Sequence, residues 1–259
     1  GRDLADKPRG VFVIDAFGLN VDELRDQHPA IYQWLTTRVK AERDSKSDTK
    51  DGAGYARLWW LFGKPRQEMR KQLAGLGRYI ATVETTKHRI FQWLDIKIAP
   101  DNMLIVIAHD QPATLGVLSS RVHALWALAA GGTLEDRPRY NKTRCFETFP
   151  FPALSDAQAH TIGALAEKID AHRKKQQAAY PDVTLTGLYN VLEKQRRHTP
   201  LNAKEKTLHA HGLAAVLNEL HNELDAAVLE AYGWQDLAGA LLGQHDALTP
   251  LLYKHDSLA

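Results

Sequence analysis

The chain has 259 residues, 44% of them hydrophobic, which is enough to form the core of one large domain or two modest ones. A single cysteine, Cys145, excludes a disulfide framework within the chain and is typical of a reducing, cytoplasmic setting. No apolar run approaches the roughly 20 residues of a membrane span, and the N-terminal residues lack the apolar core of a signal peptide.

The net charge of +2 is unevenly distributed along the chain. Residues 1–150 hold 23 Lys and Arg against 18 Asp and Glu, whereas residues 151–259 hold 10 against 13. Within 57–97, nine basic residues accompany three acidic ones. This excess is expected if the first part of the chain meets a polyanion, although many solvated surfaces look the same. The chain starts without Met, and we expect it to be part of a longer protein.

The N-terminal quarter predicts one strand followed by helices. The apolar, partly β-branched run at 11–14 predicts a short buried strand. Helical spacing of apolar residues over 20–40 predicts a helix that His28-Pro29 divides in two. The polar stretch 42–54 predicts a surface loop, and helical character returns over 65–76.

The middle of the chain predicts a small sheet. Runs at 78–83, 89–94 and 103–108 have strand composition and are separated by polar turns. The segment 114–132 predicts one helix with an apolar face, ended by Gly131-Gly132.

The texture changes after Pro152. Residues 155–242 are rich in Ala, Leu, Gln, Lys and Glu, with helical periodicity and no strand signal. The predicted fold is therefore an α+β domain over 1–150, followed by an all-α helical unit over 151–259.

Motifs of catalytic or metal sites are missing from the sequence. It contains no G-x-S-x-G, no H-E-x-x-H, no Walker loop and no CxxC pair. His209 and His211 would need metal ligands from elsewhere and fit a solvent-facing helix better. Cys145, beside Phe146, fits a small buried residue. We assign no catalytic residue and no metal ligand.

Three basic, hydroxyl-bearing clusters point to nucleic acid instead. They are "VETTKHRIF" (83–91), "LSSRVHALW" (118–126) and "RPRYNKTR" (137–144). Lys and Arg bind phosphate or guanine, and Thr binds either kind of group, although each cluster alone also fits a capped turn or an ordinary amphipathic helix. The predicted DNA-binding residues are Arg78, Thr85, Thr86, Lys87, His88, Arg89, Ser120, Arg121, Arg137, Arg139, Lys142 and Arg144.

An aromatic, proline-rich segment follows the last cluster directly. Prolines fix the direction of the chain, and each buried phenylalanine stabilises its packing by roughly 1.5–3 kcal/mol. We therefore predict a domain joint that anchors the helical unit, formed by Phe146, Phe149, Pro150, Phe151 and Pro152.

These stretches together resemble a known family. The segments that carry the resemblance are "PRGVFVIDAFG", "WWLFGKPR", "RYIATVETTKHRIFQWLD", the helix from Leu115 to Trp126, "RYNKTRCFETFPFP", "TLTGLYNVLEK" and "ELDAAVLEAYGW". In this order they are similar to MmeI-like DNA methyltransferases, the type IIL restriction-modification proteins. The resemblance covers nearly the whole chain and implies a target recognition domain plus the C-terminal helical region.

The resemblance also implies what this chain lacks. Such proteins carry a Gly-rich S-adenosylmethionine loop, an Asn-Pro-Pro-Tyr tetrad and an Asp…Glu-x-Lys nuclease site, and none of these is in the sequence. The implied function is sequence-specific recognition of double-stranded DNA for an adenine-N6 methyltransferase domain in the same parent chain. The cofactor, S-adenosylmethionine, is expected in that missing domain, and this fragment should neither methylate nor cleave by itself.

Two other readings stay open at this point. One is an RNA-binding or protein-docking module, with Phe91 and Trp93 as possible stacking residues. The other is a compact nuclease that holds a metal with Asp95, Asp101 and Asp110.

Overall fold

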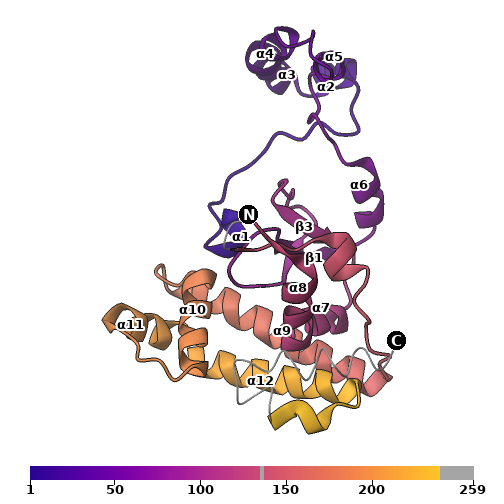
Figure 1. Ribbon diagram of the computed structural model, residues 1–259. Coiled ribbons are helices and arrows are strands. Elements are labelled where there is room, and N and C mark those ends of the chain that lie inside the picture. The colour runs from indigo at the N-terminus through magenta and orange to yellow at the C-terminus, as the bar shows by residue number, and fades with distance from the viewer. Residues whose placement is uncertain (135–136, 240–259) are drawn as a thin grey trace. The chain divides into compact units, whose positions relative to one another are not determined.

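The computed structural model describes residues 1–134 and 137–239 (Figure 1). The chain divides into two compact units, one formed by 10–74 and the other by 1–9 together with 75–259. Among the helices in the described ranges, none is both long and apolar enough to cross a membrane.

The 10–74 unit is built from short helices. A capping box starts the first of them: the Asn20 side chain accepts from the amide of Glu23, whose carboxylate accepts from the amide of Asn20 at 2.8 Å. Pro29 occupies the first turn of the second helix, as the predicted division at His28-Pro29 requires. The elements are α2 (Val21–Gln27), α3 (Pro29–Leu35), η1 (Thr36–Lys40), α4 (Ala41–Asp44), α5 (Gly52–Arg57) and α6 (Gln67–Leu73).

Two expectations for this unit are corrected. The strand expected at 11–14 does not form, and Phe12 is 99% exposed. The run has strand composition, but no neighbouring strand pairs with it, and composition alone cannot supply one. The loop expected over 42–54 contains the start of α5 and the end of α4.

The sheet of the second unit has three antiparallel strands. They are β1 (Arg78–Val83), β2 (Gln92–Asp95) and β3 (Leu104–Ile107), in the order β2-β1-β3. Ile80 on the central strand lies opposite Trp93 on one side and Ile107 on the other. These buried side chains, with Phe91 and Tyr140, form one core cluster.

The helix expected over 114–132 is broken in two. Ser120 has an extended ψ of 158° and separates α7 (Pro112–Ser119) from α8 (Arg121–Gly131). Its side-chain oxygen accepts from the amide of His123, so it acts as the N-cap of α8. A small hairpin follows, with β4 (Thr133–Leu134) paired to β5 (Arg137–Pro138), and then η2 (Lys142–Phe146).

The last part is helical, as expected. Its elements are α9 (Asp156–Ala179), α10 (Leu185–Arg196), α11 (Ala203–His211), α12 (Ala214–Ala231) and η3 (Gln235–Leu237). Ser155 and Gln158 form the capping box that starts α9. The predicted fold class, α+β followed by all-α, is confirmed.

The α+β part and the helical part share a hydrophobic core. Val117 and Phe149 lie in the same buried cluster as Leu188 and Leu217. Helices α7 and α9 approach each other closely at Gly116, where a Cβ would lie 2.4 Å from the Ile162 side chain. The boundary expected at residue 150 lies inside this unit, and the division there stays a prediction.

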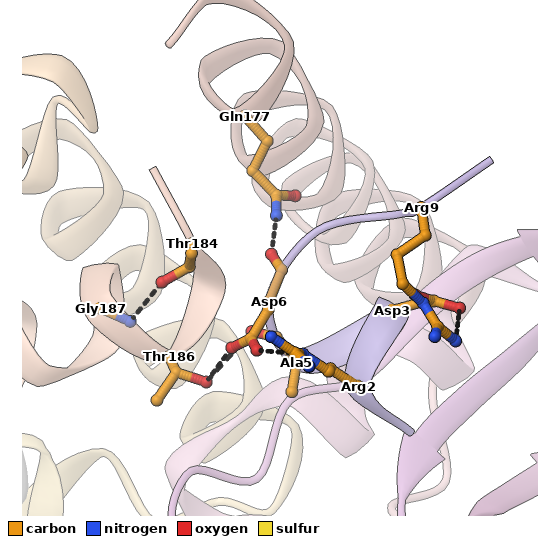
Figure 2. A network of polar contacts seen from close by, with 9 residues as sticks. All are labelled: Arg2, Asp3, Ala5, Asp6, Arg9, Gln177, Thr184, Thr186 and Gly187. Carbon is orange, nitrogen blue, oxygen red and sulfur yellow. Dashed lines mark hydrogen bonds and ion pairs between the residues drawn. The ribbon is translucent and has the colours of Figure 1, made fainter. Parts of the chain in front are cut away.

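The N-terminal segment is attached to both parts of this unit. Figure 2 shows Gln177 of α9 donating to the backbone oxygen of Asp6 at 2.7 Å, and Thr186 of α10 donating to that of Ala5 at 3.1 Å. On the sheet side, Gln92 donates to the oxygen of Leu4 at 2.9 Å. The short helix α1 (Arg2–Ala5) is therefore held between β2 and the helical part.

Candidate nucleic-acid interface

The first and third basic clusters come together after β1. The backbone amide of Tyr140 donates to the oxygen of Glu84 at 2.7 Å, and that of Thr86 donates to Pro138 at 3.3 Å. Thr85 and Arg139 form an isolated antiparallel bridge. We call the residues Glu84–Thr86 and Arg137–Arg139 the recognition face. Segments about fifty residues apart in sequence thus form one surface.

Arg139 is oriented on this face by an acid that the sequence analysis missed. Its guanidinium lies 2.6 Å and 2.7 Å from the Glu84 carboxylate, and its side chain is 49% exposed. Glu84 is the one acidic residue between Arg78 and Asp95. That isolation inside a basic stretch, directly after a strand, is the signal that could have identified it.

Arg89 is largely buried and binds backbone oxygens next to the recognition face. Its guanidinium donates to the backbone oxygens of Val83 and Pro138 and lies 4.9 Å from the centre of the Tyr140 ring. Burial lowers its pKa to about 10. Arg89 therefore joins β1 to the hairpin, and its predicted contact with DNA stays a prediction.

Lys87 and His88 lie against α10. Lys87 Nζ is 2.8 Å from both the Asn190 side-chain oxygen and a carboxylate oxygen of Glu193. His88 Nε2 is 2.8 Å from the same Asn190 oxygen, and burial lowers the pKa of this imidazole while the Asn190 contact opposes the shift. The loop is thus fastened to the helical part beside the recognition face.

Arg78 lies at the other end of β1. Its guanidinium pairs with Glu167 of α9 at 2.5 Å and stacks 3.9 Å from the centre of the Trp93 ring. Val83 lies five positions further along β1, which is about 17 Å along a strand. Arg78 is therefore not brought together with the recognition face.

The second basic cluster is also placed elsewhere. Arg121 Nε lies 2.8 Å from the buried Asp225 carboxylate of α12, and its Nη2 donates to Asn222 at 2.5 Å. The Arg121 amide donates to Asp225 at 2.6 Å, so this acid caps α8 together with Ser120. Ser120 is fully buried. The structure gives both predicted residues a role at the contact between α8 and α12.

The remaining cations of the third cluster are on η2, just after the face. Lys142 pairs with Glu147 at 2.7 Å, and Arg144 is exposed. Their predicted contacts with DNA, like those of Thr85, Thr86 and Arg137, are compatible with these positions and stay predictions.

The aromatic segment runs from the α+β part onto the helices. Phe149 is buried, with its ring 4.3 Å from His123 and 4.9 Å from Phe151. The backbone oxygen of Pro150 accepts from the Tyr232 hydroxyl at 2.7 Å. Phe146 packs against Phe151 at 5.6 Å, while Pro152 leads towards α9.

The described residues contain no candidate metal site. Among them, no group of three or more His, Cys, Asp or Glu could hold a metal ion. Asp101, one of the three acids considered for a nuclease, pairs with the N-terminal amine at 2.6 Å and accepts from the Met103 amide.

The fold defines the class of protein, an α+β part that shares its hydrophobic core with a helical part. The family model described as "MmeI, target recognition domain" matches residues 19–153, more than half of the chain. The chain belongs to this family, as its motifs predicted.

Two similar proteins extend this comparison. DNA methyltransferase A of Bacillus subtilis (strain 168) is 36% identical over 90 residues, which is 34% of this chain and 10% of that protein. A solved structure of the type IIL restriction-modification enzyme MmeI in complex with DNA matches 92% of this chain and 28% of its own, with a TM-score of 0.58 and 23% identity. The latter likeness shows the fold. This chain spans less than a third of either protein.

Proposed function

We propose that this chain recognises a specific double-stranded DNA sequence for an adenine-N6 methyltransferase domain of the same parent chain, in a restriction-modification system. The observation that carries the proposal is the recognition face, where a half-exposed Arg139, aimed by Glu84, adjoins two threonines. Membership of the target recognition domain family supports it.

The mechanism is a division of labour. A methyltransferase must flip its target base out of the duplex, so it reads little beyond that base. The flanking bases are read in the major groove by Arg on guanine and by Thr on either kind of base, while phosphate contacts set the register. On this face Arg139 is the guanine reader and Thr85 and Thr86 serve neighbouring bases. Glu84 limits the rotamers of Arg139 and so reduces the entropy lost on binding.

The remaining parts of the proposal concern the parent protein. S-adenosylmethionine would supply the methyl group in the methyltransferase domain. This sequence has no Gly-rich loop and no Asn-Pro-Pro-Tyr tetrad to hold it, so no step in this chain involves the cofactor. We place the parent in the cytoplasm, where its DNA substrate lies.

The structure favours duplex DNA over RNA as the ligand. RNA readers stack bases on exposed aromatic side chains of a sheet. The aromatic residues considered for this role, Phe91 and Trp93, are 0% and 4% exposed and belong to the core.

The test uses the full-length parent in a host free of DNA methylation. The host DNA is sequenced by a method that detects methyladenine, for the parent and for Arg139→Ala. A discrete motif that becomes degenerate at one position in the variant is expected, because a bidentate Arg contributes about 1–3 kcal/mol of discrimination.

Arg78→Ala is the matched control, since Arg78 also pairs with a glutamate but lies at the other end of β1, away from the recognition face. It should leave the motif unchanged. A motif that survives Arg139→Ala intact would remove Arg139 from the readers, and the absence of any discrete motif would end the proposal.

A further inference from the structure

The turn that joins α5 to α6 in the 10–74 unit is held by two arginines. Arg43 Nη1 donates to the backbone oxygen of Leu61 at 2.6 Å. Arg70 Nε donates to that of Pro65 at 2.8 Å, and its Nη2 lies 2.8 Å from the Asp15 carboxylate. Both cations are thus engaged inward, and they fix the path of the backbone between the two helices.

Three other cations lie on the outside of the same turn. Arg57 is the last residue of α5, and Lys64 and Arg66 precede α6; all three side chains are exposed. Among the described residues, no carboxylate lies within ion-pairing distance of any of them. A surface that keeps three cations without acids on a fixed backbone is suited to an anion from outside.

The connection between the two helices returns to α5 just before Lys64. A Cβ on Gly63 would lie 3.0 Å from the Tyr55 ring, so this backbone packs against a side chain of the helix that ends with Arg57. Phe62, in the same turn, is 43% exposed. A connection that exposes cations together with an apolar ring fits the sugar-phosphate backbone of a nucleic acid better than a small anion.

We propose that Arg57, Lys64 and Arg66 bind phosphates of the DNA backbone as a sequence-independent clamp, made by residues other than those of the recognition face. The inference rests on the proposed function, because it takes duplex DNA as the ligand. Phosphates are the same in every sequence, so this clamp adds affinity and salt dependence but no base discrimination.

The test measures binding of the whole chain to two fluorescein-labelled duplexes of unrelated sequence, one AT-rich and one GC-rich, over a series of NaCl concentrations. The variant is Arg57→Ala/Lys64→Ala/Arg66→Ala. Its affinity should fall by on the order of tenfold to a hundredfold on both duplexes alike. The slope of log affinity against log salt should become shallower by about 2 to 3, because each phosphate contact contributes about 0.9.

The matched control removes the same charge from the same unit. Arg25, Lys40 and Lys46 are each paired with exposed acids, at 3.0, 2.6 and 2.5 Å, and are replaced together by Ala. Little change is expected. An equal loss of DNA affinity in the two triple variants would mean that only net charge matters, which would overturn the clamp. Unchanged affinity in the Arg57/Lys64/Arg66 variant would overturn it as well. An unsubstituted chain that binds neither duplex would also overturn the clamp, because phosphate contacts do not depend on sequence, whereas failure of the proposed function shows as the absence of any discrete methylated motif.

Discussion

Two histidines are enclosed in the interior as neutral rings. His123 Nε2 lies 2.8 Å from the Tyr140 hydroxyl, and burial lowers the pKa of the imidazole to about 3. His221 Nε2 lies 2.7 Å from the Tyr189 hydroxyl, and burial, followed by neighbouring cations such as Arg196, lowers its pKa well below the ordinary value. Protonation of either imidazole therefore destabilises the folded chain.

The sign of the pH dependence follows from these lowered values. In the unfolded chain a histidine titrates near a pKa of about 6.5, so below that pH the unfolded state binds more protons than the folded one. The stabilisation is fully present above about pH 6.5 and is lost as the pH falls towards the folded pKa. Each such histidine contributes about 1.4 kcal/mol per pH unit in this window.

His123→Gln should flatten this dependence. The free energy of unfolding is measured by urea titration at about pH 6.5 and about pH 5. Between these two values it should fall by about 2 kcal/mol less in the variant than in the unsubstituted chain. His160→Gln, on the exposed face of α9, is the control, and its free energy of unfolding should depend on pH as that of the unsubstituted chain does. The same pH dependence in the unsubstituted chain and the His123 variant would contradict a neutral, buried ring.

At the scale of elements, α8 depends on an acid from α12. Asp225 is fully buried, accepts from the Arg121 amide and pairs with the Arg121 guanidinium. Removing one partner of a buried pair leaves the other charge uncompensated, which costs about 3–5 kcal/mol. Asp225→Ala should therefore lower the free energy of unfolding by about that amount.

A double-mutant cycle separates the pair from simple loss of packing. Arg121→Met added to Asp225→Ala should recover part of the loss, because no unpaired charge then remains buried. Glu230→Ala, at an exposed position of the same helix, should stay close to the parent in urea unfolding. Additive losses at Arg121 and Asp225 would mean that the two side chains do not act together.

The elements that could be predicted from sequence are those with a local cause. β1 and β3 follow from dense β-branched runs, and α9 follows from its Ser155 cap and long helical periodicity. The hairpin β4–β5 has only two residues in each strand and no alternating pattern, so it left no signal. The run at 11–14 had the signal of a strand but found no partner strand.

The candidate site could be predicted as segments but not as individual roles. The first and third clusters do form one surface, because the chain returns to the end of β1 after α8. Nothing local to Arg121 indicates that an acid 104 residues later would bind it. The same holds for Arg89, whose acceptors include a carbonyl 49 residues away.

For the whole molecule, the shared core decides whether the recognition part can exist alone. Val117, Val122 and Phe149 are buried in one cluster with side chains of α9, α10 and α12. A fragment that ends at residue 153, where the family match ends, would expose this apolar surface to water. Exposed patches of this kind favour loosely packed, aggregation-prone states.

We therefore expect the fragment 1–153 to bind the dye ANS, which reports exposed apolar surface. In calorimetry, residues 75–153 of the fragment should lack the cooperative unfolding transition that they show in the full chain. Supplying 154–259 as a separate chain should suppress the dye signal and restore the transition, because the missing half of the core returns. A fragment 1–153 that melts cooperatively by itself would instead make residue 150 a true domain boundary. The helical part would then be a separate domain, and Asp225 could no longer be required to hold α8 in place.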